Sequence, residues 1–218
     1  MNLKDWINPL YLDSKHILKI REELISQEYV NIVALENFLN ERKKEQLEQE
    51  LQNCKKEYLK KETYKDGTLD IDFYSYQWEF ITELKGFFHS ETFLKYLSLF
   101  FWYKLGFMYD RDFMNEVTRG WILVQTFTSE NHLNWHDDRD DAAMVLYYLN
   151  YDWTKEKWWE LELGYQDEKG SYIGYGTITP EFNKLVLLVP KLWTYHRVTP
   201  VQEGYLRKGL VEHLVFAK

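Results

Sequence analysis

Residues 185–189, Leu185-Val186-Leu187-Leu188-Val189, are apolar at every position. A short run of this kind is typical of a β-strand buried on both faces. Similar apolar runs, separated by turn residues, surround it in the second half of the chain, at 121–127, 143–149, 159–165, 193–198 and 210–216. Many short strands at this spacing predict a β-sandwich or β-barrel.

Residues 1–119 have a different pattern, which favours helices. Apolar residues recur three and four positions apart after polar residues that are suited to cap a helix. Three such helices are predicted, with caps and buried stripes at Ser14 (Ile17, Ile20, Leu24), Asn40 (Leu47, Leu51, Cys54) and Ser90 (Phe93, Leu97, Phe100, Phe101). We also predict a short strand over 30–35 and an exposed, charged loop from Lys61 to Asp72.

Helices come first and strands afterwards, with no Pro/Gly/Ser-rich linker and no internal repeat. This order predicts one α+β domain over residues 1–218. Residues 1–119 would form a mainly helical support. Residues 120–218 would form a double-stranded β-helix, or jelly roll, with the N-terminal helices packed on one of its sheets.

Composition and charge limit the classes of partner. The formal net charge of −8 would repel a phosphate backbone, so nucleic acid is disfavoured as a partner. The single cysteine, Cys54, cannot form an internal disulfide, which fits a reducing compartment. The chain has no signal-peptide pattern and no apolar run near the roughly 18–20 residues that span a bilayer. We therefore expect a cytoplasmic protein with no membrane contact.

His136-Asp137-Asp138 and the distant His196 provide the residue types of a metal site. In an extended strand, side chains two positions apart share a face, so His136 and Asp138 would point the same way. Two imidazoles and one carboxylate make the facial triad of non-haem Fe(II) oxygenases, which leaves other metal positions open. A surface pair is the alternative for His136 and Asp138 alone. Arg207, eleven residues past His196, is a permanent cation suited to binding a carboxylate in fork geometry.

These residues stand in an order that resembles the catalytic half of the prolyl-hydroxylase-like Fe(II)/2-oxoglutarate dioxygenases. The small oxygen-sensing and ribosomal-protein prolyl hydroxylases and their bacterial relatives are the most similar. The resemblance covers residues 121–216 and is carried by His136-Asp137-Asp138, Tyr147-Tyr148-Leu149-Asn150, Glu160-Leu161-Glu162-Leu163, the strand 185–189, Tyr195-His196-Arg197-Val198, Gly204 and Arg207.

The resemblance implies roles for five residues. His136, Asp138 and His196 would be the iron ligands and also the catalytic residues. Arg207 would bind the distal carboxylate of 2-oxoglutarate, and the Tyr148 hydroxyl would donate to the same carboxylate. An ordinary core tyrosine is the alternative for Tyr148, and a surface salt bridge is the alternative for Arg207.

The resemblance also implies an enzyme that uses Fe(II), 2-oxoglutarate and O2, with ascorbate as an optional reductant. It would couple decarboxylation of 2-oxoglutarate to succinate with C–H hydroxylation. A prolyl or other residue in a protein or peptide is the first expected substrate, and a free amino acid or small metabolite is the alternative. A non-catalytic jelly-roll binding module is the alternative from another class, and a DNA-repair oxygenase is opposed by the net charge. The oligomeric state is left open.

The sequence departs from the family pattern near the expected site. Trp158-Trp159 stands where relatives carry Gly-Gly, and these rings would either line the pocket or pack between strands. The spacing from His196 to Arg207 is about one residue longer than usual, which predicts a bulge near Glu203-Gly204. His213 shares strand parity with Arg207, and we interpret it as a core or rim histidine.

Overall fold

The computed structural model describes residues 1–26, 31–53, 56–63, 69–76, 79–101, 103–107, 124–138, 141–154, 159–191 and 194–217. Within these residues, the first half of the chain supplies helices and four strands. They are η1 (Leu3–Asp5), η2 (Pro9–Leu12), α1 (Ser14–Ser26), β1 (Asn31–Leu35), α2 (Glu41–Asn53), β2 (Lys56–Thr63), β3 (Leu69–Tyr76), α3 (Glu79–Phe88), α4 (Glu91–Leu97) and β4 (Leu105–Phe107).

The second half is built from eight strands in the described residues. They are β5 (Val124–Phe127), β6 (His132–His136), β7 (Ala143–Tyr148), β8 (Leu161–Gln166), β9 (Tyr172–Ile178), β10 (Leu185–Val189), β11 (Thr194–Val198) and β12 (Arg207–Phe216). They pair antiparallel in the orders β10-β7-β12-β5 and β6-β11-β8-β9, which form the two sheets of a double-stranded β-helix. The predicted α+β jelly roll is therefore confirmed.

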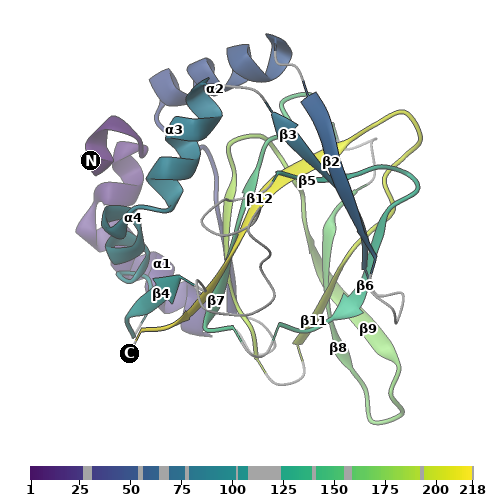
Figure 1. Ribbon diagram of the computed structural model, residues 1–218. Helices are drawn as coiled ribbons and strands as arrows, with labels where there is room; N and C mark the ends of the chain where they lie inside the picture. The colour runs from purple at the N-terminus through teal and green to yellow at the C-terminus, as the bar shows by residue number, and fades with distance from the viewer. Residues whose placement is uncertain are drawn as a thin grey trace.

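Strands from the first half extend these sheets. β1 pairs with β10 and extends what we call the major sheet, β1-β10-β7-β12-β5. β3 pairs with β5 and also with β6, so it connects the major sheet to the minor sheet, β6-β11-β8-β9. The helices cover the outer face of the major sheet, at the left of Figure 1. The support from residues 1–119 is thus partly β-structure as well as helical.

The strand β10 explains why its sequence is apolar throughout. It lies between β1 and β7, and Leu185, Val186, Leu187 and Leu188 are all at most 1% exposed. One face of the strand packs under the helices and the other faces the interior of the jelly roll. The prediction of a strand buried on both faces is confirmed.

Alternate residues of β7 divide the core into two layers, as the period of two in a strand requires. Val145 and Tyr147 pack against the helices, in a cluster that includes Phe88 and Phe93. Met144, Leu146 and Tyr148 point the other way, into a second cluster with residues of β8 and β10. The space between the two sheets begins on this second face.

Two of the predicted helix caps are correct and one is displaced by a residue. The side chains of Asn40 and Ser90 each accept a hydrogen bond from the backbone N–H three residues on, at 3.1 Å. At the start of α1 the cap is Asp13, whose carboxylate accepts from the His16 N–H at 2.9 Å. Ser14 is the first helical residue. Asp13 precedes it in the sequence and is an equally good cap.

Other expectations need correction. The loop predicted from Lys61 to Asp72 was wrong at both ends, because β2 and β3 occupy them and pair with each other. Helix α3 and strands β4, β6 and β9 were not predicted. Phe100 and Phe101 are buried but lie beyond the end of α4. Cys54 lies outside the described residues.

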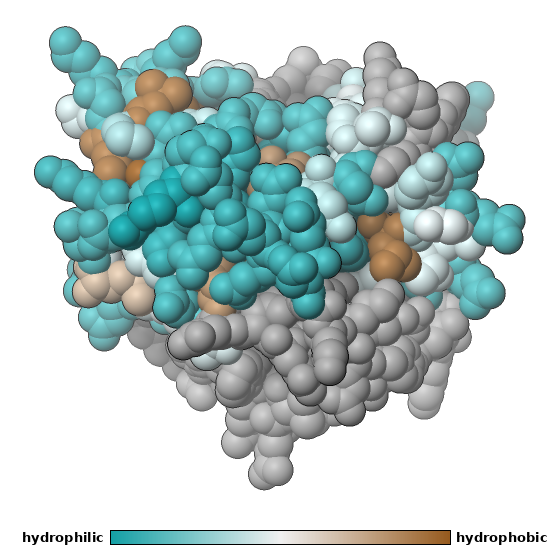
Figure 2. Space-filling view, turned by 90° about the horizontal axis from the view of Figure 1, so that it is seen from above, coloured by the Kyte–Doolittle hydropathy of each residue, from teal (hydrophilic) through white to brown (hydrophobic). Residues whose placement is uncertain are grey.

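The surface seen from above the molecule is largely hydrophilic (Figure 2). Helix α2 runs along this side in Figure 1, and only Lys43, Leu47 and Leu51 are buried among its described side chains. The narrow buried stripe predicted for this helix fits that arrangement. No helix in the described part of the chain is both long enough and apolar enough to cross a membrane.

Candidate metal centre

The structure brings His136, Asp138 and His196 together at one end of the minor sheet. His136 is the last residue of β6 and lies directly opposite His196 in β11, with 4.0 Å between the ring centroids. Asp138 follows two residues later, and its Oδ2 is 3.8 Å from His136 Nε2 and 3.3 Å from His196 Nε2. One ligand atom from each residue lies within 4.8 Å of the others.

The donor atoms of these three residues are directed toward a common point. Asp138 Oδ2 is buried but makes no hydrogen bond, although an imidazole lies 3.3 Å away. His136 Nδ1 lies 2.8 Å from the Asn134 carbonyl oxygen, which can only accept, so Nδ1 carries the proton and Nε2 is a free lone pair. Two imidazole nitrogens and one carboxylate oxygen fit the ligand preference of Fe(II).

The ionisation of the three residues also favours metal binding at neutral pH. Burial lowers the pKa of His136 to about 4, and the nearby His196 lowers it further. Burial alone would raise the pKa of Asp138, but the neighbouring imidazoles of His196, His136 and His213 outweigh it and hold the pKa well below its usual range. His136 is therefore neutral and Asp138 is charged, which are the forms that bind a metal.

Arg207 and Tyr148 lie next to each other on the major sheet. Arg207 is the first residue of β12 and Tyr148 the last of β7, and they are 4% and 1% exposed. The Arg207 Nη2 donates a hydrogen bond to the Tyr148 hydroxyl at 3.2 Å. The guanidinium also lies over the rings of Phe127 and Tyr148, 5.2 and 5.1 Å from their centroids. A surface salt bridge does not describe this arginine.

The Arg207 guanidinium lacks an anionic partner in the described residues. Its Nε is buried and makes no hydrogen bond, and no described carboxylate forms an ion pair with it. A buried cation with a single neutral partner is costly, so a bound anion would stabilise it. The distal carboxylate of a dicarboxylic acid fits this position, because the guanidinium fork and the phenol can both donate to it.

The departures from the family pattern have structural consequences. Trp159 is fully buried and packs with Phe127, Val198 and Val201, so it is a core residue, whereas Trp158 lies outside the described residues. The extra length before Arg207 is taken up by a turn rather than by a strand bulge. Gly204 has a φ of +85° there, a conformation that favours glycine.

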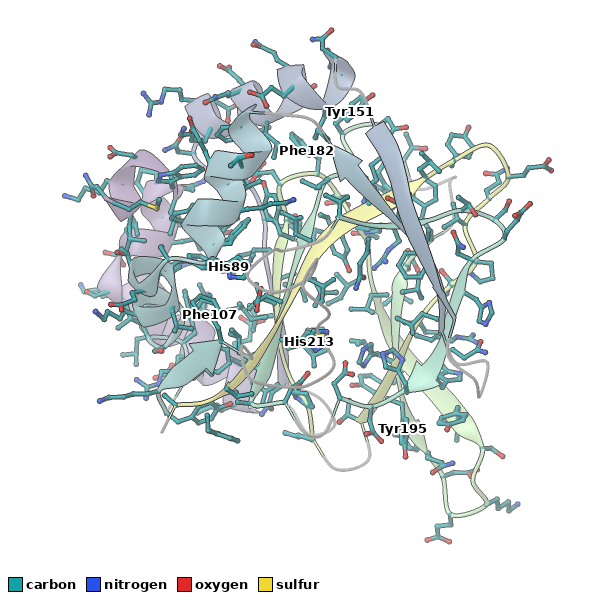
Figure 3. The ribbon with its side chains drawn as sticks, viewed as in Figure 1. His89, Phe107, Tyr151, Phe182, Tyr195 and His213 are labelled. Atoms are coloured by element: carbon teal, nitrogen blue, oxygen red, sulfur yellow. The ribbon has the colours of Figure 1, made fainter. Side chains whose placement is uncertain are left out.

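The sequence did not indicate that His213 pairs with Asp141. His213 Nδ1 lies 2.6 Å from Asp141 Oδ2, and one ligand atom from each lies within 4.8 Å of one from Asp138. Figure 3 shows His213 on the interior side of β12, whereas His89 lies on the helical side. The parity that His213 shares with Arg207 was the available signal. Asp141 gave no signal because only the turn after Asp138 brings it back to the site.

Comparisons with known proteins agree with this geometry. Residues 122–213 match the family model of the 2OG-Fe(II) oxygenase superfamily. A prolyl hydroxylase from Trichoplax adhaerens, solved with a hypoxia inducible factor peptide fragment, is similar in structure, with a TM-score of 0.62 and 17% identity over 95% of this chain and 92% of that one. No curated protein matches the sequence.

Two further solved structures share the fold at lower identity. A Pseudomonas putida prolyl-4-hydroxylase has a TM-score of 0.56 and 10% identity, over 93% of this chain and 100% of that one. The non-heme alpha ketoglutarate dependent epimerase SnoN from nogalamycin biosynthesis has a TM-score of 0.59 and 9% identity, over 94% and 85%.

Fold and site together define a class, the double-stranded β-helix oxygenases with a candidate His-Asp-His triad. Through residues 122–213 the chain belongs to the 2OG-Fe(II) oxygenase superfamily, and Fe(II) and 2-oxoglutarate are the cofactor and co-substrate that this membership implies.

Proposed function

We propose that this chain is an Fe(II)- and 2-oxoglutarate-dependent hydroxylase that acts on a prolyl or other residue of a protein or peptide. The observation that carries the proposal is the joint arrangement of two sites. His136, Asp138 and His196 converge at the minor sheet, and the buried cation of Arg207 faces them from the major sheet with no anionic partner in the described residues. A vestigial site in a binding module has no chemical reason to keep both.

Each residue has a role in this proposal. His136 Nε2, His196 and the Asp138 carboxylate would hold the iron in place. Arg207 and the Tyr148 hydroxyl would bind and orient the distal carboxylate of 2-oxoglutarate. When bound, iron and 2-oxoglutarate supply an oxidising centre whose formation converts the co-substrate to succinate and CO2. The apolar side chains of Phe127 and Val198 would limit access of water to the bound co-substrate.

A peptide substrate is supported by likeness of fold. The Trichoplax prolyl hydroxylase binds a peptide fragment and is similar to this chain over nearly its whole length. The same fold occurs in an epimerase of antibiotic biosynthesis, so a free amino acid or small metabolite is the second candidate. These two substrate classes differ in one testable respect, which is whether the reactive residue must lie within a polypeptide.

The test is a coupled measurement of succinate and product mass. The protein is incubated with Fe(II), 2-oxoglutarate, O2 and a panel of proline-containing peptides. We expect succinate in a one-to-one ratio with a peptide that has gained one oxygen atom, and no product with Asp138→Ala. Matched peptides with alanine in place of proline control for the residue, and free proline controls for the polypeptide context. Turnover of free amino acids alone would reject the peptide substrate and favour the second candidate.

A further inference from the structure

The three candidate metal ligands are not held equally well by the fold. His136 and His196 are paired across β6 and β11, so the strand ladder fixes both. Asp138 lies two residues beyond the end of β6, where no ladder hydrogen bond holds it. A ligand that must be accurately placed therefore needs support from outside its own strand.

That support comes from Asp141. The Asp141 backbone N–H donates a hydrogen bond to the Asp138 carbonyl oxygen at 2.8 Å, which closes the turn between them. The next residue, Ala142, donates to the Leu214 carbonyl oxygen of β12 at 2.8 Å. Asp141 is thus tied to the major sheet at the point where β7 begins.

His213 completes the connection from the strand that also carries Arg207. Its register partner in β7 is Met144, and its Nδ1 lies 2.6 Å from the Asp141 carboxylate, which is 6% exposed. Asp138, Asp141 and His213 each bring one ligand atom to within 4.8 Å of the others. The imidazole therefore lies close to both carboxylates and reduces the repulsion that they would otherwise exert on each other.

We propose that Asp141 and His213 form a positioning pair, which holds the Asp138 carboxylate from the major sheet and so sets the affinity of the site for its metal. This inference rests on the proposed function, because it assigns the pair to the same metal. Loss of residues that orient metal ligands commonly weakens metal binding by about 10- to 100-fold. His213 and Asp141 are positioning residues here, and neither is a ligand.

The experiment is a titration of the full chain with Mn(II), in which electron paramagnetic resonance counts the free ion directly. His213→Leu should weaken Mn(II) binding by about 10- to 100-fold. His213→Asn should recover most of the affinity, because its amide can donate to Asp141 from near the Nδ1 position. His16→Leu is the matched control, since His16 lies on α1 against Tyr11, and it should bind Mn(II) like the wild type. Thermal melting of each variant checks that it is folded.

Three results would overturn the inference, and they differ in what they imply. If the folded His213→Leu variant binds Mn(II) like the wild type, the positioning pair is wrong and the proposed function stands. If the wild type binds two Mn(II) per chain and His213→Leu loses one, the pair ligates a second ion. If the wild type binds no Mn(II), the proposed function fails as well. One Mn(II) per chain, weakened in His213→Leu and recovered in His213→Asn, supports the inference.

Discussion

Replacing Arg207 with methionine should abolish co-substrate binding with little effect on the stability of the free protein. The two effects separate because the arginine is buried without an anionic partner in the described residues. Desolvation of its charge costs several kcal/mol. Its hydrogen bond to Tyr148 returns about 1.5–3 kcal/mol, and its contacts with two rings return about 0.5–2 kcal/mol each. These contributions nearly cancel, so removing them together should change the unfolding free energy by less than about 2 kcal/mol.

The loss of binding should be much larger. Truncating one partner of a buried, hydrogen-bonded charge pair costs about 2–5 kcal/mol, so the affinity for 2-oxoglutarate should fall by at least about 30-fold. At a concentration about 100 times its Kd, 2-oxoglutarate stabilises the wild type by about 2.7 kcal/mol. The same concentration should stabilise Arg207→Met by less than about 1 kcal/mol. For a chain of this size, the shift in Tm falls from roughly 5–10 °C to at most about 4 °C.

Thermal melting in the presence of Mn(II), with and without 2-oxoglutarate, measures both quantities. Lys184→Met is a matched control, because Lys184 is also buried but forms ion pairs with Glu36 and Glu181 at 3.0 and 3.2 Å. It should destabilise the free protein more than Arg207→Met does, and it should leave the 2-oxoglutarate shift intact. A strongly destabilised Arg207→Met variant that keeps the full 2-oxoglutarate shift would refute the reasoning.

Three further predictions follow from the same structure. Since burial lowers the pKa of His136 to about 4, the Mn(II) affinity should be nearly constant from about pH 8 to pH 6 and should decline below about pH 5, as isothermal titration at each pH would show. Burial raises the pKa of Glu212 from its ordinary 4.5 to about 7, so its ionisation opposes folding increasingly as the pH rises through this window. Glu212→Gln should therefore raise the Tm at pH 8, by relieving about 3 kcal/mol, and leave it nearly unchanged at pH 4; an equal gain at both pH values would reject this origin. Leu187→Ala should destabilise the protein by about 2–5 kcal/mol in urea unfolding, because its side chain is fully buried between the helices and β10, and a loss below about 1 kcal/mol would contradict that packing.

The sequence was sufficient where a local pattern matches its environment. Residues 185–189 are apolar because β10 is covered on both faces, and that composition predicts the strand with its correct ends. The structure also brings His136, Asp138 and His196 together as the motif predicted, although Asp138 lies beyond the strand rather than in it. In both cases the information lies in neighbouring residues or in a known spacing.

Other features depend on contacts that no local pattern reveals. Strand β9 was missed because it is glycine-containing and largely exposed at the edge of the minor sheet, so it lacks an apolar run. The Asp141–His213 contact joins residues 72 positions apart, and only the β12–β7 register places them together. The lack of an anionic partner for Arg207 is likewise a property of the assembled core.

An anaerobic titration of the protein with Fe(II) and 2-oxoglutarate tests the central claim most directly, because a chelated keto acid gives a visible charge-transfer band. The account predicts a band in the wild type that saturates at one iron per chain and weakens in both Asp138→Ala and Arg207→Ala. If the folded wild-type protein takes up iron and shows no band, the proposed mechanism is wrong, and the chain is better explained as a jelly-roll binding module.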